Sequence, residues 1–267
     1  MQFDFGKNWA EFSEHALTDD RVAQARHEFI QLLEGIPVNG RSFLDIGFGQ
    51  GLSLLTAASL GAYAVGCDIN PRCRKVLEQN KRFFPQLGLR DMPVVIGSIL
   101  DPEITRTIQA TPGVPADGFD IVHSWGVLHH TGDMKRAIEI AASLVRHEGH
   151  FIVALYNRHW SSPVWLGVKW LYCKSPTLLQ KILVRVFVPV IWLAKLVVTG
   201  RNPRHQQRGM HFYYNVVDWV GGYPYEYASI REVEALCDPL GFKLVRATPA
   251  NVPTGCNEFV FRRDRAR

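Results

Sequence analysis

Short apolar segments alternate with stretches of helical periodicity over most of the first 155 residues of the chain. Five segments have the length and apolar content of buried strands: 42–46, 63–67, 93–97, 118–123 and 150–155. Helical patterns lie between most of them, so we expect parallel strands joined by helical crossovers. Further along, a helix is predicted over 229–237 and strands over 242–247 and 258–262. The pattern predicts an α/β fold with a doubly wound, mostly parallel, seven-stranded sheet.

The N-terminal part of the chain precedes this alternating region. Residues 1–39 are expected to form a helical cover, in which the opening segment Phe5–Trp9 is followed by a helix over about 17–35. At 267 residues with 47% hydrophobic content, the chain is long enough to bury a sizeable core. We therefore expect one domain over 1–267.

An insertion over 158–212 separates the fifth strand from the last helix. Helical patterns cover 164–172 and 178–198. In the second pattern, apolar residues recur at spacings of three and four, as on one helix face: Leu178, Leu179, Ile182, Leu183, Val186, Val190, Leu193 and Val197. Three residues interrupt this apolar run and predict a poor transmembrane span: Arg185, Pro189 and Lys195.

Basic charge is concentrated in the same insertion. The chain has a net charge of +5, yet Gly149–Val217 contains nine Lys or Arg residues and no Asp or Glu. The remaining residues carry 21 basic and 25 acidic groups. We favour a helical lid packed over the sheet edge and pocket; the alternative is a basic amphipathic surface over 164–198 that rests on anionic lipid. We do not expect nucleic acid as a partner, because no known nucleic-acid module is recognised in the sequence.

The cysteines indicate the redox setting. The five cysteines form no C-x-x-C pair, and Cys67 and Cys237 fall in apolar patterns typical of buried thiols. The N-terminus has no basic region followed by an apolar core, so no signal peptide is predicted. These features favour a reducing, cytoplasmic setting, with the inner membrane surface as the site of any peripheral contact.

A glycine-rich turn follows the first predicted strand. After Asp45, glycines stand at the alternate positions Gly47, Gly49 and Gly51. A helical pattern begins at Leu52. Glycine allows positive φ and a close approach of backbone to ligand. A dinucleotide fingerprint would require its third glycine at position 52, which is Leu52. The D-x-G-x-G-x-G pattern instead resembles motif I of class I S-adenosylmethionine (SAM) methyltransferases, although an ordinary glycine turn is the alternative.

The second predicted strand also ends in an acid. Asp68 lies 17 residues after Gly51, close to the offset of about 20 residues at which an acid meets ribose hydroxyls. A carboxylate there accepts hydrogen bonds from adenosine, with Ile69 beside it. Capping of a helix that starts at Pro71 is a compatible structural role. Asp68 supports adenosine binding without separating SAM from NAD.

The resemblance extends over roughly 40–156. The stretch Asp120–Thr131 is similar to the region between strands 4 and 5 of ubiquinone- and menaquinone-type methyltransferases. The whole chain resembles a bacterial group of methyltransferases that share several segments: Phe5–Trp9, Trp125–Thr131, Arg208–Met210, Asp218–Tyr225 and Gly255–Phe261. The resemblance implies SAM as cofactor, S-adenosylhomocysteine as product, and a Rossmann-like sheet with an antiparallel C-terminal hairpin.

The same resemblance assigns the cofactor contacts. Asp45 would lie near the ammonium group of SAM, and the three glycines would pack against its amino acid part. Ser98 and Ile99 stand where the family flanks adenine, although the family often has Asp in place of Ser98. Trp125 would touch the cofactor or wall the acceptor pocket, or else lie in the core.

Candidate catalytic residues follow strands 4 and 5, at the sheet edge where open α/β folds bind ligands. They are His129, His130 and Tyr156. An imidazole is a suitable base near neutral pH, and His130 is the position favoured by the family resemblance. The alternative is structural, with one histidine capping the next helix and the other packed inside.

The acceptor pocket is expected to hold aromatic and polar side chains: Trp9, Asn157, Arg208, Tyr213, Tyr225 and Asn257. No metal site is predicted, because the loop after strand 4 has no carboxylate until Asp133. The sequence favours methyl transfer to a hydroxyl on a lipophilic or anionic small molecule. Alternatives are N-methylation, methylation of a peptide or glycan, a SAM-binding module without turnover and, last, a NAD-linked oxidoreductase. The oligomeric state stays open.

Overall fold

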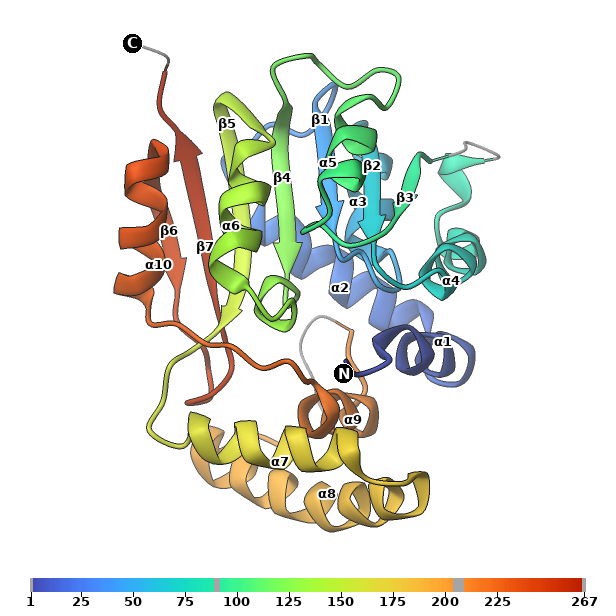
Figure 1. Ribbon diagram of the computed structural model, residues 1–267. Helices are drawn as coiled ribbons and strands as arrows, with labels where there is room; N and C mark the ends of the chain where they lie inside the picture. The colour runs from blue at the N-terminus through green and yellow to red at the C-terminus, as the bar shows by residue number, and fades with distance from the viewer. Residues whose placement is uncertain (1, 89–91, 204–208, 266–267) are drawn as a thin grey trace.

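A seven-stranded sheet crosses the computed structural model, which describes residues 2–88, 92–203 and 209–265 (Figure 1). The strand order is β3-β2-β1-β4-β5-β7-β6, with β1 to β5 parallel and β7 antiparallel to both β5 and β6. The predicted doubly wound sheet with an antiparallel hairpin is confirmed. Its strands are β1 (Ser42–Ile46), β2 (Tyr63–Asp68), β3 (Val94–Ile96), β4 (Phe119–Trp125), β5 (Val145–Tyr156), β6 (Phe242–Thr248) and β7 (Cys256–Arg263).

Helices cover both faces of the sheet because strand side chains alternate between the faces. In β1, Phe43 packs in the cluster with Phe29 and Leu54, whereas Leu44 packs on the opposite face with Ala137 and Val233. The first face is covered by α2 (Asp19–Leu32), α3 (Leu52–Ser59) and α4 (Arg72–Asn80), and the second by α5 (Pro102–Gln109), α6 (Met134–Ser143) and α10 (Ile230–Cys237).

The N-terminal cover differs from the prediction. The opening segment is itself a helix, α1 (Phe5–His15), and the following helix α2 begins at Asp19 rather than near residue 17. Two side-chain caps set this division: the carboxylate of Asp4 accepts a hydrogen bond from the Lys7 amide, and the hydroxyl of Thr18 accepts one from the Arg21 amide. The Phe5–Trp9 segment thus forms the first turns of α1, which packs against α4 (Arg72–Asn80) and against a later helix over Phe212–Gly221.

One strand extends beyond its predicted bounds, and one helix was not predicted. Strand β5 begins at Val145, because the segment before residue 150 continues the ladder with β4 past a bulge near Phe119. Residues just after the insertion form α9 (Phe212–Gly221), which the sequence analysis did not predict.

The insertion and α9 together form a helical layer. Helices α7 (Ser162–Lys174), α8 (Thr177–Thr199) and α9 lie beyond the carboxyl ends of the strands, at the lower end of Figure 1. They share a small core made of Tyr172, Val184, Ile191, Val216 and Val220. Helix α8 continues through Pro189, and it is long and apolar enough to cross a membrane by length and composition. That result differs from the expectation of a poor span.

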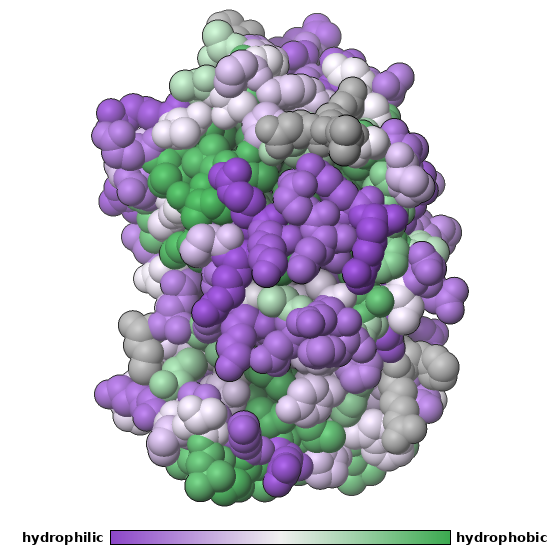
Figure 2. Space-filling view, turned by 90° about the vertical axis from the view of Figure 1, so that its right-hand side faces the viewer, coloured by the Kyte–Doolittle hydropathy of each residue, from purple (hydrophilic) through white to green (hydrophobic). Residues whose placement is uncertain are grey.

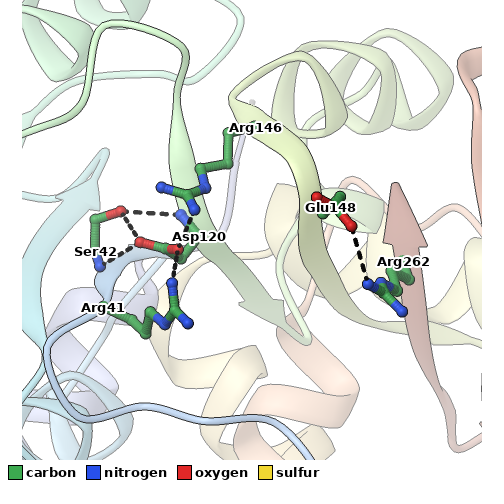
Figure 3. A network of polar contacts seen from close by, with 6 residues as sticks. All are labelled: Arg41, Ser42, Asp120, Arg146, Glu148 and Arg262. Carbon is green, nitrogen blue, oxygen red and sulfur yellow. Dashed lines mark hydrogen bonds and ion pairs between the residues drawn. The ribbon is translucent and has the colours of Figure 1, made fainter. Parts of the chain in front are cut away.

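A polar network closes the opposite, amino-terminal end of the strands (Figure 3). Asp120 accepts hydrogen bonds from the amide and hydroxyl of Ser42 at 2.9 and 2.8 Å, and it pairs with Arg41 and Arg146. These hydrogen bonds and charges outweigh burial and lower the pKa of Asp120. The network fixes β1 against β4, so the ends of both strands at the other edge are held in register.

Candidate active site

A cavity of about 1520 Å³ lies at the carboxyl ends of the parallel strands. Its walls come from the ends of β1, β2, β4 and β5, from the N-terminal segment, and from α8 and α9. Ligand pockets usually occupy about 300–1,000 Å³, so this cavity has room for a cofactor and an acceptor side by side. Open α/β sheets bind ligands at this edge.

The glycine turn forms one wall of the cavity. Its three glycines all have positive φ, of 75° at Gly47, 54° at Gly49 and 82° at Gly51. A Cβ atom added at Gly47 would lie 2.4 Å from the Val127 side chain, so no other residue fits without displacement. The turn therefore brings bare backbone to the cavity surface, as predicted.

The Asp68 carboxylate holds the backbone of this turn by a hydrogen bond. One of its carboxylate oxygens accepts a hydrogen bond from the Gly49 amide at 2.9 Å, and the other accepts one from the Asn70 amide at 2.8 Å. Burial is the largest effect on Asp68 and raises its pKa. Each carboxylate oxygen has a second lone pair, so Asp68 both holds the backbone and keeps acceptor capacity toward the cavity. Its neighbour Ile69 also lines the cavity.

A histidine that the sequence analysis missed contacts Asp45. The two residues are register partners on β4 and β1, and Nδ1 of His123 lies 2.8 Å from Oδ1 of Asp45. Both are buried and both line the cavity. The pair holds the Asp45 carboxylate in one orientation. A histidine inside an otherwise apolar strand was the signal that pointed to it.

The other predicted cofactor residues also reach the cavity wall. Ser98, Ile99 and Trp125 all line it. The Ser98 hydroxyl accepts a hydrogen bond from the Leu100 amide at 3.2 Å, and the Trp125 indole donates one to Glu258 at 2.7 Å. Trp125 is thus half-buried: it packs against the core cluster that contains Phe29, and its indole is held by a residue of β7.

The adjacent histidines have different surroundings within a 3-10 helix, η3 (Leu128–His130). His130 lines the cavity, and its Nδ1 lies 2.6 Å from the carbonyl oxygen of Pro224. A carbonyl only accepts, so Nδ1 is protonated and Nε2 has the free lone pair. Burial is the main cause that lowers the pKa of His130 to about 3, so the ring is neutral at physiological pH.

His129 is fully buried and does not line the cavity. Its Nδ1 accepts a hydrogen bond from the Tyr156 amide at 3.2 Å, and burial lowers its pKa well below the usual value. The ring centroids of His129 and Tyr156 lie 4.0 Å apart. His129 therefore orients Tyr156, whose own side chain reaches the cavity wall.

A buried lysine and a nearby acid form a group that the sequence analysis did not find. The Lys169 ammonium lies over the rings of Trp219 and Tyr225, at 4.1 and 4.7 Å from their centroids. Asp218 lines the cavity and accepts a hydrogen bond from Asn8 at 2.6 Å. Burial shifts both groups toward neutrality, and the pKa of each is about 7. Asp218 is the first acid after the acid-free segment, which was the available signal.

The predicted substrate residues divide into two sets. Trp9 lines the cavity, and its ring lies against Gly49. Four others are not among the residues that line it: Asn157, Tyr213, Tyr225 and Asn257. Arg208 lies outside the described residues.

The structure gives these four residues other positions. The Asn257 amide donates to Asn157 at 3.0 Å and its oxygen accepts from the Ala250 amide, so the two asparagines hold the loop before β7. Tyr213 is exposed, and Tyr225 is buried beside Lys169. Residue type alone did not predict which of them line the cavity, because the direction in which a side chain leaves its helix or strand decides whether it faces the cavity.

No cluster of three or more metal-ligating side chains occurs within residues 2–88, 92–203 and 209–265. Independence from metal ions stays a prediction.

A mostly parallel sheet in this order, with a glycine turn after β1 and an acid at the end of β2 at one cavity, defines the class I SAM-dependent methyltransferase fold. The chain belongs to the methyltransferase domain family, whose model matches residues 16–246. SAM is the cofactor that this family implies, and the bare glycine backbone with Asp68 behind it fits such a ligand.

Curated relatives share about half of the chain. It is 28% identical over 153 residues to a ubiquinone biosynthesis O-methyltransferase of Bartonella quintana (strain Toulouse), a match of 55% of this chain and 56% of that protein. It is 30% identical over 138 residues to the protein of the same name from Methylobacterium sp. (strain 4-46), covering 52% and 50%. The chain thus spans about half the length of the curated relatives it matches.

Solved structures share the fold along most of the chain. A magnesium protoporphyrin IX methyltransferase from Synechocystis PCC 6803 with bound SAH has a TM-score of 0.52 at 15% identity, covering 91% of this chain and 83% of that one. A methyltransferase in complex with the Trm112 activator of Haloferax volcanii has a TM-score of 0.58 at 14% identity, covering 100% and 99%. These likenesses concern the fold.

Proposed function

We propose that this protein transfers a methyl group from SAM to a hydroxyl of a lipophilic or anionic small molecule. The observation that carries the proposal is one cavity lined by both the glycine turn and the His130 side chain. The names of the curated relatives support a hydroxyl acceptor. N-methylation and methylation of a peptide or glycan are the competing reactions.

The cofactor half of the proposed site lies at the ends of β1 and β2. When bound, SAM supplies a methyl group activated by a sulfonium leaving group. The glycine turn would pack against the amino acid part, with Asp45 near the ammonium group and Asp68 accepting hydrogen bonds from the ribose. Ile69, Ser98 and Ile99 would flank adenine, and Trp125 would separate the two halves of the cavity.

His130 is the proposed base. Its Nδ1 is fixed on the Pro224 carbonyl, so Nε2 is the atom that takes the proton from the acceptor hydroxyl. His129 and Tyr156 act as positioning residues beside it: the ring of His130 lies 4.4 Å from that of His129 and 5.4 Å from that of Tyr156. Their packing restricts rotation of the His130 ring.

The acceptor half of the proposed site lies under the insertion, which acts as a lid. Trp165, Ile191 and Trp219 line this side of the cavity, together with the amine of Lys195. Burial lowers the pKa of Lys195, and a negatively charged group nearby would favour its charged form. Arg201 also lines the cavity close to Lys195 in the sequence, and apolar walls with cationic groups among them fit a lipophilic acceptor that has an acidic substituent. We retain a cytoplasmic setting as a prediction from the cysteine pattern.

Calorimetric titration with SAM, S-adenosylhomocysteine and NAD tests the cofactor. We expect binding of the first two in the micromolar range, equivalent to about −8 kcal/mol, and none of NAD. The glycine spacing gives the physical reason, since the third glycine of a dinucleotide fingerprint is Leu52. Binding of NAD alone, or of no ligand, would contradict the proposal.

Removal of divalent metal tests the proposed mechanism in a second way. Methyl transfer should continue unchanged in EDTA, because the base is an imidazole and the cavity needs no Lewis acid to lower the pKa of an acceptor hydroxyl. The measurement is the initial rate with and without EDTA, followed by added Mg²⁺. A loss in EDTA that Mg²⁺ restores would show that a metal takes part.

A further inference from the structure

Helix α8 is apolar on two opposite sides, but the protein covers only one of them. On its inner side, Val184 and Ile191 are buried against α7 and α9. Its outer side, which we name the α8 outer face, consists of Leu178, Leu179, Ile182, Val186, Val190, Leu193 and Val197. These side chains are 39–75% exposed, and only 11% of the most apolar 18-residue window of the helix is buried.

The α8 outer face is a continuous stripe rather than scattered residues. Its members recur at spacings of three and four, so they lie along one side of the helix. In Figure 2, apolar side chains gather at the lower end of the molecule, the end where α7 and α8 lie in Figure 1. An apolar stripe of this length on a water-exposed surface marks an interaction site.

The charges around the stripe indicate its partner. Lys181 and Arg185 are exposed, and their positions place them along one edge of the α8 outer face. Neither has a carboxylate partner among the described residues, and the segment Gly149–Val217 contains no acid. On α7, the Lys174 ammonium lies 4.5 Å from the centroid of the exposed Trp170 ring. Apolar stripes bordered by Lys, Arg and Trp are typical of helices at the surface of an anionic membrane.

The same helix forms part of the cavity wall. Ala194 and Val198 line the cavity and are also exposed, so the cavity opens to the surface beside the last turns of α8. Lys195 lies between them on the cavity side. A membrane in contact with the α8 outer face would therefore lie next to this opening.

We propose that the α8 outer face lies in the headgroup region of an anionic membrane, with the helix parallel to the surface. Contact with α7 and α9 holds α8 in the globular fold, which favours this arrangement over a transmembrane one. The opening beside Val198 then admits a lipophilic acceptor from the bilayer. This last step rests on the proposed function, whereas the docking does not.

Flotation with lipid vesicles tests the docking. We expect the wild-type protein to float with vesicles that contain phosphatidylglycerol, and not with vesicles of phosphatidylcholine alone. Val190→Glu puts a charge in the middle of the α8 outer face and should weaken the binding at least about tenfold. Val245→Glu is the matched control: Val245 on β6 is 61% exposed against 52% for Val190, and it receives the same charge.

The basic edge is tested in the same assay. Lys181→Gln with Arg185→Gln should weaken binding to phosphatidylglycerol vesicles, because each basic residue near the surface adds electrostatic attraction. Lys75→Gln with Lys135→Gln removes two exposed positive charges elsewhere and should leave binding unchanged. Circular dichroism and the melting temperature confirm that each variant pair is equally folded.

Several outcomes would overturn the docking. They are a wild-type protein that stays unbound to anionic vesicles, a Val190→Glu variant that binds like Val245→Glu, and a protein that resists extraction at alkaline pH, as a transmembrane helix does. A lipid-free dimer that Val190→Glu converts to a monomer would assign the face to a second copy of the chain. None of these measurements depends on methyl transfer, so they separate a failure of the docking from a failure of the proposed function.

Discussion

The His130→Asn variant is expected to lose about 10²- to 10⁴-fold in kcat, the usual contribution of a positioned general base. Asparagine keeps an N–H group close to the position of Nδ1, so the hydrogen bond to Pro224 is retained and only the Nε2 lone pair is removed. SAM affinity should be unchanged, because the glycine turn and Asp68 are untouched. Steady-state kinetics and calorimetry measure the two effects separately.

His129→Asn provides the control for that result. It makes the same substitution one position earlier, at a residue outside the cavity wall, and the asparagine oxygen can still accept from the Tyr156 amide. We expect a smaller loss of kcat. Equal losses in the two variants would assign both effects to packing. Full activity in His130→Asn would contradict the assignment of the base, and normal SAM binding by a protein without turnover would favour the SAM-binding module.

The pH dependence distinguishes His130 from Asp218, another candidate base in the cavity wall. Because the pKa of His130 is lowered to about 3 from 6.5, its imidazole stays neutral as the pH falls through 6.5, and the rate should persist into the mildly acidic range. Asp218 also lines the cavity, and burial raises its pKa to about 7. A carboxylate base must be ionised, so dependence on Asp218 would make kcat fall as the pH drops below about 7. Such a decline would transfer the role of base to Asp218.

Gly47→Ala is expected to weaken SAM binding at least about tenfold, or roughly 1.4 kcal/mol. The backbone at this position has φ of 75°, and the added methyl group would lie 2.4 Å from Val127. A residue with a Cβ in the left-handed region costs about 1–2 kcal/mol, and relief of the clash must move the turn or Val127, both of which line the cavity. Calorimetry gives the affinity, and thermal unfolding gives the stability.

Gly40→Ala is the matched control for Gly47→Ala. Gly40 has φ of 72°, nearly the same backbone strain, but nothing lies within 4 Å of an added Cβ and the residue is not in the cavity wall. It should lose a similar amount of stability from strain alone and bind SAM like the wild type. If both variants lose SAM affinity equally, the loss reflects general destabilisation and the glycine turn is not the cofactor site.

The sheet was predictable because its signals are local. The seven strands were located from short apolar segments, and the positive φ of the turn glycines followed from the residue type. Boundaries were less accurate where a single side chain decides them. The Asp4 cap starts α1 and the Thr18 cap starts α2. The sequence analysis gave the opening segment no helix bounds of its own and placed the start of the second helix two residues early.

The site was predictable where a residue follows directly from the end of a strand. Asp45, Asp68 and His130 line the cavity because parallel strands end at one edge, and all three were named from their positions along the chain. Residues in loops and later helices were not. Asn157 and Asn257 were expected in the acceptor pocket, but they hydrogen-bond each other across 100 positions of sequence.

The positions of the strands along the chain, the glycine turn and the acid-free insertion are properties of neighbouring residues, and the amino-acid sequence alone determines them. Long-range packing decided the rest. Asp45 meets His123 across 78 positions, and Asn8 meets Asp218 across 210. Long-range packing also decides which side of α8 is buried, because the local sequence of a helix that is apolar on both sides favours neither side for burial. Its neighbours α7 and α9 cover one side and leave the other exposed.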